Sequence, residues 1–317
     1  MQFLIGQRSL QMFKGFLLHL LLMMPILFVT ASCARQQQES HSAADQTAAF
    51  EGNELTIGTF NIKWLGDGEN DRTPRTDEEV KLIAECIRDT KADVLALQEI
   101  ESDGALARLT KWLPDFKYIV SDRGGAQRVA FLYRSSLQVA KVAEFDELAI
   151  SSGLRPGLIV DCRVGAFDVR LMAVHFKATS SYDNTEEKRL RSYNIRREQA
   201  AMVNTWFNKL LADGQEDDII VMGDFNDNPV DDATPTLAEL EANASFRFLT
   251  GELASCKNAK WTSIDHIAVS PAVYSMVDPA SVGTYSLYHR YKREVAERIS
   301  DHCPVLVRFA LDQQDSL

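Results

Sequence analysis

Six short apolar segments of this chain each end in a carboxylate, an amide or an imidazole. The six ends are Phe60-Asn61, Gln98-Glu99, Val174-His175, Gly223-Asp224-Phe225-Asn226, Ile264-Asp265-His266 and Ser300-Asp301-His302. Apolar segments of this length predict buried strands, and polar groups at strand ends converge on one edge of a sheet. Oxygen ligands suit a hard cation, and imidazoles can bind or protonate a phosphate. The pattern therefore predicts one active site for a metal ion and a phosphate.

Glu99 is the first candidate metal ligand, because it stands at the end of a predicted buried strand. A carboxylate there is costly unless it is paired or bound to a cation. Asn61 ends the preceding apolar segment, where on its own it would be an ordinary turn residue. A salt-bridged Glu99 is the structural alternative.

The Gly223–Asn226 turn places a carboxylate and an amide close together after the apolar stretch Ile219–Met222. Asp224 can orient or deprotonate an attacking water, while Asn226 donates to a phosphate oxygen. Such a turn also occurs by chance, so it indicates a functional site only in combination with the other segment ends. The polar residues that follow are predicted to form a solvated loop, with a structural Ca²⁺ site as the alternative. They are Asp227, Asn228, Asp231 and Asp232.

The order of the six ends resembles the endonuclease/exonuclease/phosphatase superfamily, the metal-dependent phosphodiesterases similar to deoxyribonuclease I. The resemblance covers roughly Glu54 to Phe309. It implies that Asn61, Glu99 and Asp301 hold Mg²⁺, with Mn²⁺ as the alternative ion. It also implies an α/β fold, a four-layer α-β-β-α sandwich in which two packed, mostly antiparallel sheets are flanked by helices.

Ser300-Asp301-His302 is the most specific mark of this resemblance. The resemblance implies that His302 contacts the phosphate and that Asp265 accepts a hydrogen bond from it, which sets the tautomer and basicity of the imidazole. His175 is implied to be the second histidine of the site, as a general acid or a phosphate binder. Relatives most like deoxyribonuclease I have a Glu partner for this histidine, which we do not find in the sequence. We predict that His266 is structural.

Two basic stretches, 188–197 and 288–293, could grip substrate phosphates. The second interleaves aromatic and basic side chains, which can stack on bases or sugars. Neighbouring glutamates support a solvated charged face equally well. Arg128, in front of an apolar segment, resembles a family position whose Arg reaches the phosphate. The candidates for substrate binding are Arg128, Arg196, Arg197, Tyr288 and Arg290.

Hydrophobic periodicity predicts the elements that must position these groups. A strand is expected over Leu55 to Ile62, and a helix follows it, because Thr76 and Glu79 can form a capping box before an apolar repeat that reaches Ile87. A long helix is expected over about Ile195 to Leu211. Further strands are expected at 93–97, 128–133, 157–163, 167–174, 218–222, 263–269 and 304–311.

The first residues form a separate segment. Arg8 and Lys14 precede an apolar stretch that ends at Thr30-Ala31-Ser32-Cys33 and is short for a membrane-spanning helix. We therefore predict an export signal over 1–32. Cys33 resembles the lipidated cysteine of bacterial lipoproteins, which implies an anchor in the outer membrane, on the periplasmic or cell-surface side. Ordinary cleavage with secretion, or a retained anchor, is the alternative.

Domain boundaries follow from composition. The segment 33–53 has almost nothing to bury and is predicted to be a flexible tether. A single catalytic domain is predicted over 54–312, since this length suits one large core, with a tail over 313–317. No oligomerisation signal is visible, so a monomer with no implied protein partner is expected.

Charge and cysteine content restrict the class of protein. The formal net charge is −11, and loss of Arg8 and Lys14 with the leader makes it −13. An acidic protein is a poor nonspecific binder of nucleic acid, but a divalent cation and local bases can reverse the field inside a cleft. The cysteines besides Cys33 are too scattered for a CxxC zinc site and can oxidise after export. We expect Cys86 as a buried thiol and at most one disulfide, between Cys256 and Cys303, with the pairing of the remaining cysteines left open.

These observations lead to one main hypothesis and two alternatives. The main hypothesis is a metal-dependent phosphodiesterase, foremost an extracytoplasmic endonuclease that cleaves DNA or RNA by attack of water on phosphorus. The first alternative is a phosphatase or phospholipase-like hydrolase of inositol phosphates or sphingomyelin, because the superfamily uses the same motifs for these substrates. The second is a surface binding protein that keeps the fold without turnover.

Overall fold

The computed structural model describes residues 50, 52–230 and 233–311. The predicted export signal, Cys33, most of the tether, Asp231, Asp232 and the tail at 313–317 lie outside the described residues. Within the described part of the chain, no helix is both long and apolar enough to cross a membrane.

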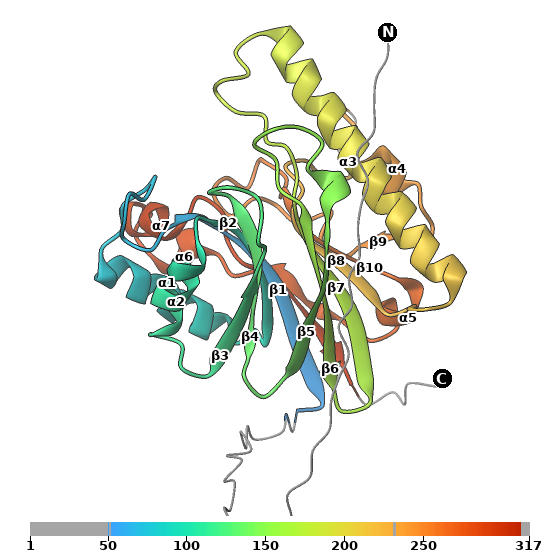
Figure 1. The fold of residues 1–317 in the computed structure, drawn as a ribbon, viewed down its shortest axis with the longest axis horizontal. Coiled ribbons are helices and arrows are strands. Elements are labelled where there is room, and N and C mark those ends of the chain that lie inside the picture. The colour runs from blue at the N-terminus through green and yellow to red at the C-terminus, as the bar shows by residue number, and fades with distance from the viewer. Residues whose placement is uncertain (1–49, 51, 231–232, 312–317) are drawn as a thin grey trace, which may run out of the picture. The chain divides into compact units, whose positions relative to one another are not determined.

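Two six-stranded sheets form the centre of the described unit (Figure 1). The first sheet has the order β11 (Val277–Thr284), β12 (Val305–Ala310), β1 (Glu54–Leu65), β2 (Val94–Ile100), β4 (Arg128–Arg134) and β3 (Phe116–Val120). The second has the order β5 (Gln138–Phe145), β6 (Gly157–Val164), β7 (Phe167–His175), β8 (Ile219–Asp224), β10 (Asp265–Val269) and β9 (Arg247–Phe248). Only the pairs β1/β2 and β7/β8 are parallel, so both sheets are mostly antiparallel, as predicted.

Helices cover the outer face of each sheet. The first sheet carries α1 (Asp77–Thr90), α2 (Asp103–Thr110), α6 (Leu287–Arg290) and α7 (Arg293–Ile299), and the second carries α3 (Glu186–Asp213) and α4 (Ala238–Glu241). The short helices η1 (Asp146–Leu148) and α5 (Pro271–Tyr274) complete the list. Phe131 and Leu171 are buried between the sheets, Ile83 of α1 is buried against the first sheet, and Phe207 of α3 is buried against the second. These three apolar layers make the four-layer sandwich that the sequence predicts.

The start of α1 is fixed by its own sequence. The backbone N–H of Glu79 donates to the Thr76 hydroxyl (3.2 Å), and the Thr76 N–H donates to the Glu79 carboxylate (2.8 Å). Each bond satisfies an N–H that would otherwise lack a helical partner. The predicted capping box is confirmed.

Two predictions about elements need correction. The helix expected from Ile195 begins at Glu186, where Thr185 caps it. Its first turns are polar and exposed and have no apolar repeat, so hydrophobic periodicity does not reveal them. The strands β3, β5, β9 and β11 were not predicted, and all four are edge strands of the two sheets. Edge strands are partly exposed, so they lack the continuous apolar segment that marks a central strand.

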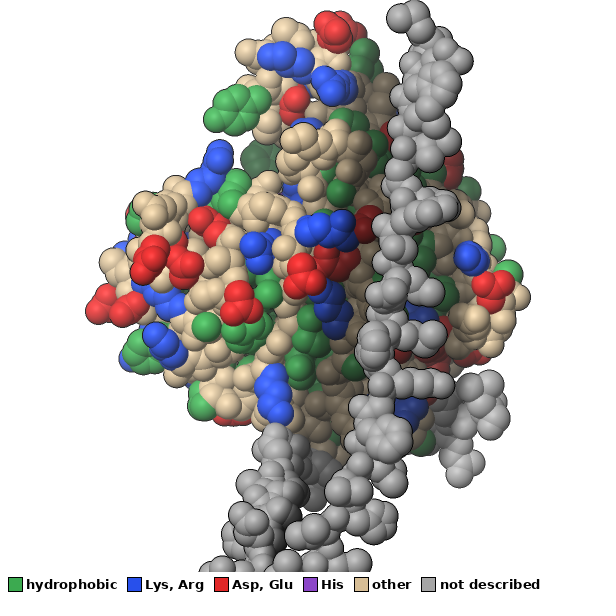
Figure 2. Space-filling view, viewed as in Figure 1, with side chains coloured by type: hydrophobic (Ala, Val, Ile, Leu, Met, Phe, Trp, Pro, Cys, Tyr) green, Lys and Arg blue, Asp and Glu red, His purple; other side chains and the backbone are tan. Residues whose placement is uncertain are grey.

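The cysteines agree with the expectations. Cys256 and Cys303 form a disulfide, while Cys86 and Cys162 are free and buried. Figure 2 shows one face of the molecule, on which basic and acidic side chains are interspersed and no single basic strip stands out.

Candidate active site

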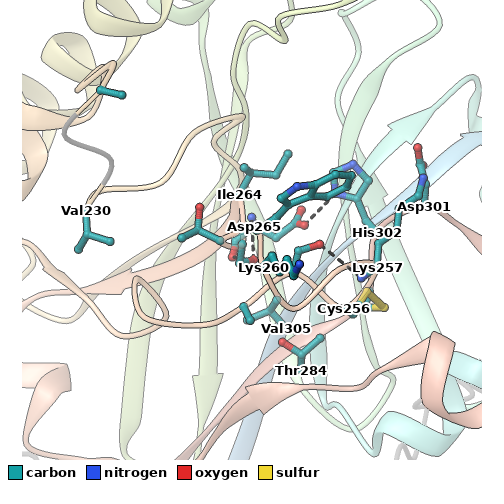
Figure 3. Close-up of a pocket in the computed structure, with 17 residues that line it drawn as sticks. Val230, Cys256, Lys257, Lys260, Ile264, Asp265, Thr284, Asp301, His302 and Val305 are labelled. Carbon is teal, nitrogen blue, oxygen red and sulfur yellow. Dashed lines mark hydrogen bonds and ion pairs between the residues drawn. A yellow bond between two sulfur atoms is a disulfide. The ribbon is translucent and has the colours of Figure 1, made fainter.

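Strand register brings the polar segment ends together. In β1/β2, Asn61 lies opposite Gln98, the neighbour of Glu99. In β7/β8, His175 lies opposite Asp224, and across β8/β10 Asp224 lies opposite Asp265. A hollow of about 770 Å³ opens beside this group, with Asp265 and Asp301 on its lining (Figure 3). The ends of central strands from both sheets therefore form one site.

The side-chain amide of Asn61 joins the two sheets. Its Nδ2 donates to Glu99 Oε1 (3.3 Å) and to Asp224 Oδ2 (3.0 Å). Its backbone oxygen accepts from the hydroxyl of Ser300 (2.7 Å), which in turn accepts from the N–H of His302 (3.0 Å). Three segments far apart in the sequence are thus held together through one residue.

The backbone at the site is conformationally unusual. Gly223 has φ 152°, and a Cβ there would lie 1.9 Å from the carbonyl oxygen of Val174, so only glycine fits. Glu99 and Asn226 adopt φ of 63° and 55°, in the left-handed region that residues other than glycine rarely occupy. Such strain is typical of functional sites, where the surrounding structure holds a side chain in a required direction.

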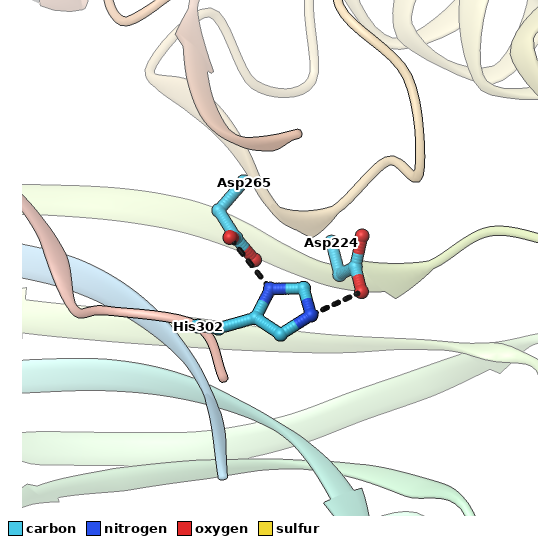
Figure 4. A group of neighbouring side chains, drawn as sticks. All are labelled: Asp224, Asp265 and His302. Carbon is cyan, nitrogen blue, oxygen red and sulfur yellow. Dashed lines mark hydrogen bonds and ion pairs between the residues drawn. The ribbon is translucent and has the colours of Figure 1, made fainter. Parts of the chain in front are cut away.

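His302 lies between two carboxylates (Figure 4). Its Nδ1 is 2.7 Å from Asp265 Oδ2, and its Nε2 is 3.9 Å from Asp224 Oδ2. Burial alone would lower the pKa of His302, but the charges of Asp265 and Asp224 outweigh it and raise the pKa to about 10. The imidazole therefore carries a proton at neutral pH, and the hydrogen bond to Asp265 fixes its orientation.

Asp224 is the buried centre of the cluster. Burial raises its pKa to about 7, the nearby Asp265 charge raises it too, and His302, Asn61 and the N–H of Asn226 lower it. Its Oδ1 accepts that N–H at 2.8 Å. A carboxylate with a pKa near 7 can accept a proton at physiological pH and release it again, which is what a general base must do.

His175 is buried against the same carboxylate. Its Nε2 lies 3.7 Å from Asp224 Oδ2, and its Nδ1 has no hydrogen-bond partner among the described residues. Burial, followed by the charges of Arg155 and His302, lowers its pKa well below 6.5. The imidazole is therefore neutral at pH 7.

The donor set fits a divalent cation. The ligand atoms of Asp224, Asp265 and His302 lie within 4.8 Å of one another. Burial raises the pKa of Glu99, which receives a hydrogen bond from Asn61 alone among the described side chains. A buried oxygen of Asp265, Oδ1, has no partner in the described structure. Buried carboxylate oxygens with unused lone pairs are what a hard cation requires.

Asp301 stands at the rim of this set. It is half-buried, lines the hollow next to His302, and its charge adds to the raised pKa of Glu99.

Arg75 is buried nearby and donates from Nη2 to the carbonyl oxygens of Ile62 (2.9 Å) and Lys63 (2.6 Å), and from Nη1 to a backbone carbonyl at the end of α7. Arg75 thereby fixes the backbone on both sides of the predicted metal ligands.

Arg155 is a site residue that the sequence analysis missed. It is 3% exposed, its Nε has no partner among the described residues, and its charge interacts with Asp224 and Glu99. Burial lowers its pKa to about 10, so it stays charged at neutral pH. In the sequence, Arg155 stands before a proline and a strand and belongs to no recognisable motif. Its position beside the buried acids becomes visible only in the fold.

The predicted substrate-binding residues lie in different surroundings. Arg196 is buried and donates to Thr236 Oγ1 (3.1 Å) and the Lys177 carbonyl oxygen (2.9 Å), with Asp227 at 3.6 Å. It therefore links α3 to Asp227 and Thr236, and these contacts give it a structural role. Arg197 is exposed and bonded to Asn194 within α3.

The remaining candidates occupy the first-sheet side. Arg128 is half-buried and donates to the carbonyl oxygen of Gly125 (3.2 Å). Arg290 is exposed and lies 4.2 Å over the ring of Tyr285, next to α1 rather than the cluster. Tyr288 is half-buried, and the charge of Asp301 contributes to its raised pKa, after burial and Glu297. Of these three, Tyr288 is tied electrostatically to a predicted metal ligand.

The polar loop after Asn226 also differs from the prediction. Asp227 and Asn228 are buried rather than solvated. The Nδ2 of Asn228 donates to the carbonyl oxygens of Gly251 and Ser263, both at 2.9 Å. His266 Nε2 bonds the carbonyl oxygen of Asp227 (3.0 Å), and its Nδ1 lies 3.2 Å from a threonine hydroxyl. These contacts hold the loop, which explains why the polar residues are buried and gives His266 the structural role predicted for it.

Fold and site together define an α/β sandwich with a buried cluster of acids, amide and imidazoles suited to a divalent cation. The model of the Endonuclease/Exonuclease/phosphatase family matches residues 58–302, so the chain belongs to that family. Membership of this family supports a hydrolase that acts on phosphoester bonds, and the acidic residues of the site could bind a divalent cation. A search of curated proteins found no match.

Solved structures with the same fold share little sequence with the chain. A truncated TDP2 from Caenorhabditis elegans has a TM-score of 0.58 at 18% identity, covering 81% of this chain and 98% of that one. Danio rerio TDP2 in complex with a single-strand DNA product gives 0.58 at 17%, covering 81% and 99%. A mannosyl-6-phosphatase from Bacteroides thetaiotaomicron gives 0.54 at 19%, covering 80% and 98%. At such identities the likeness extends to the fold alone.

Proposed function

We propose that this protein is a metal-dependent phosphodiesterase that cleaves DNA or RNA internally, outside the cytoplasm. The observation that carries the proposal is the His302 imidazole held between Asp265 and Asp224, with Asn61 linking Asp224 to Glu99. This arrangement combines a base, a charged hydrogen-bond donor and oxygen ligands around one point, which hydrolysis of a phosphate ester needs.

Asn61, Glu99 and Asp301 would hold Mg²⁺, or Mn²⁺ in its place. When bound, the cation would stabilise the negative charge that develops on the phosphate. Asp224 accepts a proton from the water whose oxygen attacks phosphorus, and its pKa of about 7 suits this task. The bond from phosphorus to the leaving oxygen then breaks in line with the attack.

The other side chains stabilise the charge on the phosphate. Protonated His302 donates to a phosphate oxygen and carries the proton that the leaving oxygen requires. Asn226 and neutral His175 donate further hydrogen bonds, and the low pKa of His175 favours this role over that of general acid. Arg155 adds a fixed positive charge beside Asp224 and Glu99.

A nuclease is supported by the family and by the DNA-bound relative among the similar folds. A phosphatase or a phospholipase-like hydrolase is the second candidate. It is favoured by the acidic charge of −11 and by the burial of Arg196, which leaves less basic surface for a polynucleotide. One of the proteins with a similar fold is a mannosyl-6-phosphatase, whose name indicates a small phosphorylated substrate. A binding protein without turnover is disfavoured, since all of the ligand acids and both histidines are present.

We also propose that lipidated Cys33 anchors the protein at the outer membrane, so that it acts on extracytoplasmic substrate. Metabolic labelling with a fatty acid tests this. The expected result is label on the wild type and none on Cys33→Ser, whereas equal labelling would contradict it.

Incubation of the full chain with supercoiled plasmid and Mg²⁺, beside EDTA and a His302→Ala variant, tests the nuclease. We expect nicking that requires both the metal and His302. If inositol phosphates or phospholipids are hydrolysed under the same two requirements and plasmid is not, the second candidate replaces the first. If none of these substrates is turned over, the binding protein replaces both.

A further inference from the structure

The hollow beside His302 has a second wall that the catalytic cluster does not use. Asp265, Asp301 and His302 line one part of it, and the segment Ala254–Ile264 lines another (Figure 3). We call this segment the 254–264 loop. Its side chains facing the hollow include Lys257, Lys260 and Trp261. A large open hollow that borders reacting groups is where the remainder of a substrate can lie.

The 254–264 loop is held in place by its backbone and by a covalent link. Ala254 and Thr262 form an antiparallel bridge, and the N–H of Ser255 donates to the Trp261 carbonyl oxygen (2.8 Å). The disulfide from Cys256 reaches Cys303, the residue directly after His302. The loop is therefore ordered relative to the imidazole before any ligand arrives, which reduces the entropy lost on binding.

Trp261 is the most exposed tryptophan of the described residues, at 58%. A single exposed aromatic residue is ordinary on a protein surface. This one, however, shares the lining of a hollow with catalytic side chains. Its open ring face offers a platform for a flat base or for the apolar face of a sugar, contacts that stabilise bound nucleic acids and carbohydrates alike.

The two lysines supply the matching charge. No carboxylate among the described residues pairs with Lys257 or Lys260, whereas Lys141 elsewhere binds Asp122 (2.7 Å) and Glu144 (2.9 Å). Ammonium groups beside a hollow attract anions, and phosphate is a common partner of lysine. An aromatic ring flanked by two ammonium groups suits a ligand that carries both a ring and a phosphate.

We infer that the 254–264 loop is the substrate subsite for a phosphorylated ring, either a nucleotide or a sugar phosphate. The ring lies against Trp261, and Lys257 and Lys260 bind its phosphate oxygens. The inference deepens the proposed function and rests on it, because the subsite would hold the part of the substrate next to the phosphate that reacts at His302.

Calorimetry of the full chain purified in detergent, in the inactive Asp224→Asn background with Mg²⁺, tests the subsite without turnover. The probes are thymidine 5′-monophosphate, mannose 6-phosphate and inorganic phosphate. Trp261→Ala should weaken binding of the ring-bearing probe about tenfold and leave inorganic phosphate unchanged, since stacking on the ring is the interaction removed. Trp261→Phe should restore most of the affinity. The Lys257→Ala/Lys260→Ala double variant should weaken all three probes.

A matched control comes from Lys111 and Trp112, an adjacent pair that lines a separate hollow without any candidate site residue. Lys111→Ala and Trp112→Ala should change nothing. Preference for thymidine monophosphate identifies a nucleotide subsite, and preference for mannose 6-phosphate a sugar phosphate subsite. The inference is overturned if the wild-type loop binds neither ring-bearing probe, or if Trp261→Ala binds them as tightly as the parent. Binding that depends on Trp261 without hydrolysis by the unmutated chain would remove the proposed enzyme and keep the subsite.

Discussion

The two sheets contribute different chemistry to one site. The first sheet brings Asn61 and Glu99 at the ends of β1 and β2, and the second brings Asp224 and Asp265 at the ends of β8 and β10. Each sheet has one parallel pair, and parallel strands end at the same edge, so each pair delivers two polar ends together. In the proposed mechanism the first-sheet group holds the cation and the second-sheet group moves protons. The ligand atoms of Asp224, Asp265 and His302 also lie close enough together to hold a cation.

Two contacts join the first-sheet group to the second-sheet group and so assemble the site. One is the Asn61 amide on Asp224, and the other is His302, which precedes β12 of the first sheet and bonds Asp265 of the second. Variants that remove one function at a time separate the two halves.

Asp224→Asn should lower kcat by about 100-fold or more, because a general base contributes on the order of 10² to 10⁴. Stability should be unchanged or higher, since the variant removes a buried carboxylate whose pKa burial has already raised to about 7. Steady-state kinetics and a thermal melt measure the two effects. Loss of activity together with a collapse of the fold would show that Asp224 is structural.

Asp265→Asn should lower kcat about 10- to 100-fold, and metal affinity should stay the same if Asn61, Glu99 and Asp301 hold the cation. The Nδ1 partner of His302 would change from a carboxylate to an amide, which weakens the orientation and charge of the imidazole. Kinetics at saturating Mg²⁺ and calorimetry with Mg²⁺ measure these effects. A large drop in metal affinity would assign Asp265 to the cation instead and erase the proposed division.

Arg155→Gln should lower kcat/KM about 10- to 100-fold, since a charged hydrogen bond from Arg155 to the phosphate would contribute about 1.5 to 3 kcal/mol. The matched control is Arg134→Gln, because Arg134 sits at the end of β4 and pairs with Asp115 (3.0 Å) instead of site residues. Steady-state kinetics of both variants measure the change in kcat/KM at each position. Equal effects at the two positions would refute a specific role for Arg155.

His266→Gln should change how stability depends on pH. Burial lowers the pKa of His266 to about 4, while the unfolded chain has the ordinary value of about 6.5. Between these values the unfolded state binds a proton that the folded state does not, so the stabilisation is complete above pH 6.5 and is lost as the pH falls towards 4. Over that window the wild type should lose roughly 3 kcal/mol more than the variant.

Urea unfolding at about pH 7 and pH 4.5 measures this difference. Exposed His289 provides the control, because His289→Gln should show the same pH dependence as the wild type. Identical curves for His266→Gln and the wild type would mean that the imidazole is protonated in the folded state.

The sequence predicted the fold and the cluster because both depend on central strands. Buried strands such as β2 and β8 are continuous apolar segments, so the polar residue that ends each one stands out. Edge strands such as β5 alternate irregularly and were missed. The first turns of α3 were missed for the same reason, since they bury nothing that would create a period.

The rest of the site depends on contacts between distant residues. Nothing in the sequence distinguishes buried Arg155 and Arg196 from exposed Arg197, because their burial follows from how loops and α3 pack. The same holds for the 254–264 loop, whose place beside His302 is set by a disulfide and a hairpin. Charged residues outside a periodic element therefore need the structure before a role can be assigned.

The most direct test of the account is the Mg²⁺ dependence of hydrolysis of a generic diester, bis(4-nitrophenyl) phosphate, by the wild type, Glu99→Gln and Glu101→Gln. Glu99 is buried beside Asn61, whereas Glu101 binds the backbone N–H of Arg72 at the surface, which makes it a matched control. We predict turnover that requires Mg²⁺, falls at least about 100-fold in Glu99→Gln and is unchanged in Glu101→Gln. Turnover that persists without metal, or that survives the loss of Glu99, would contradict a metal-dependent site at the junction of the two sheets.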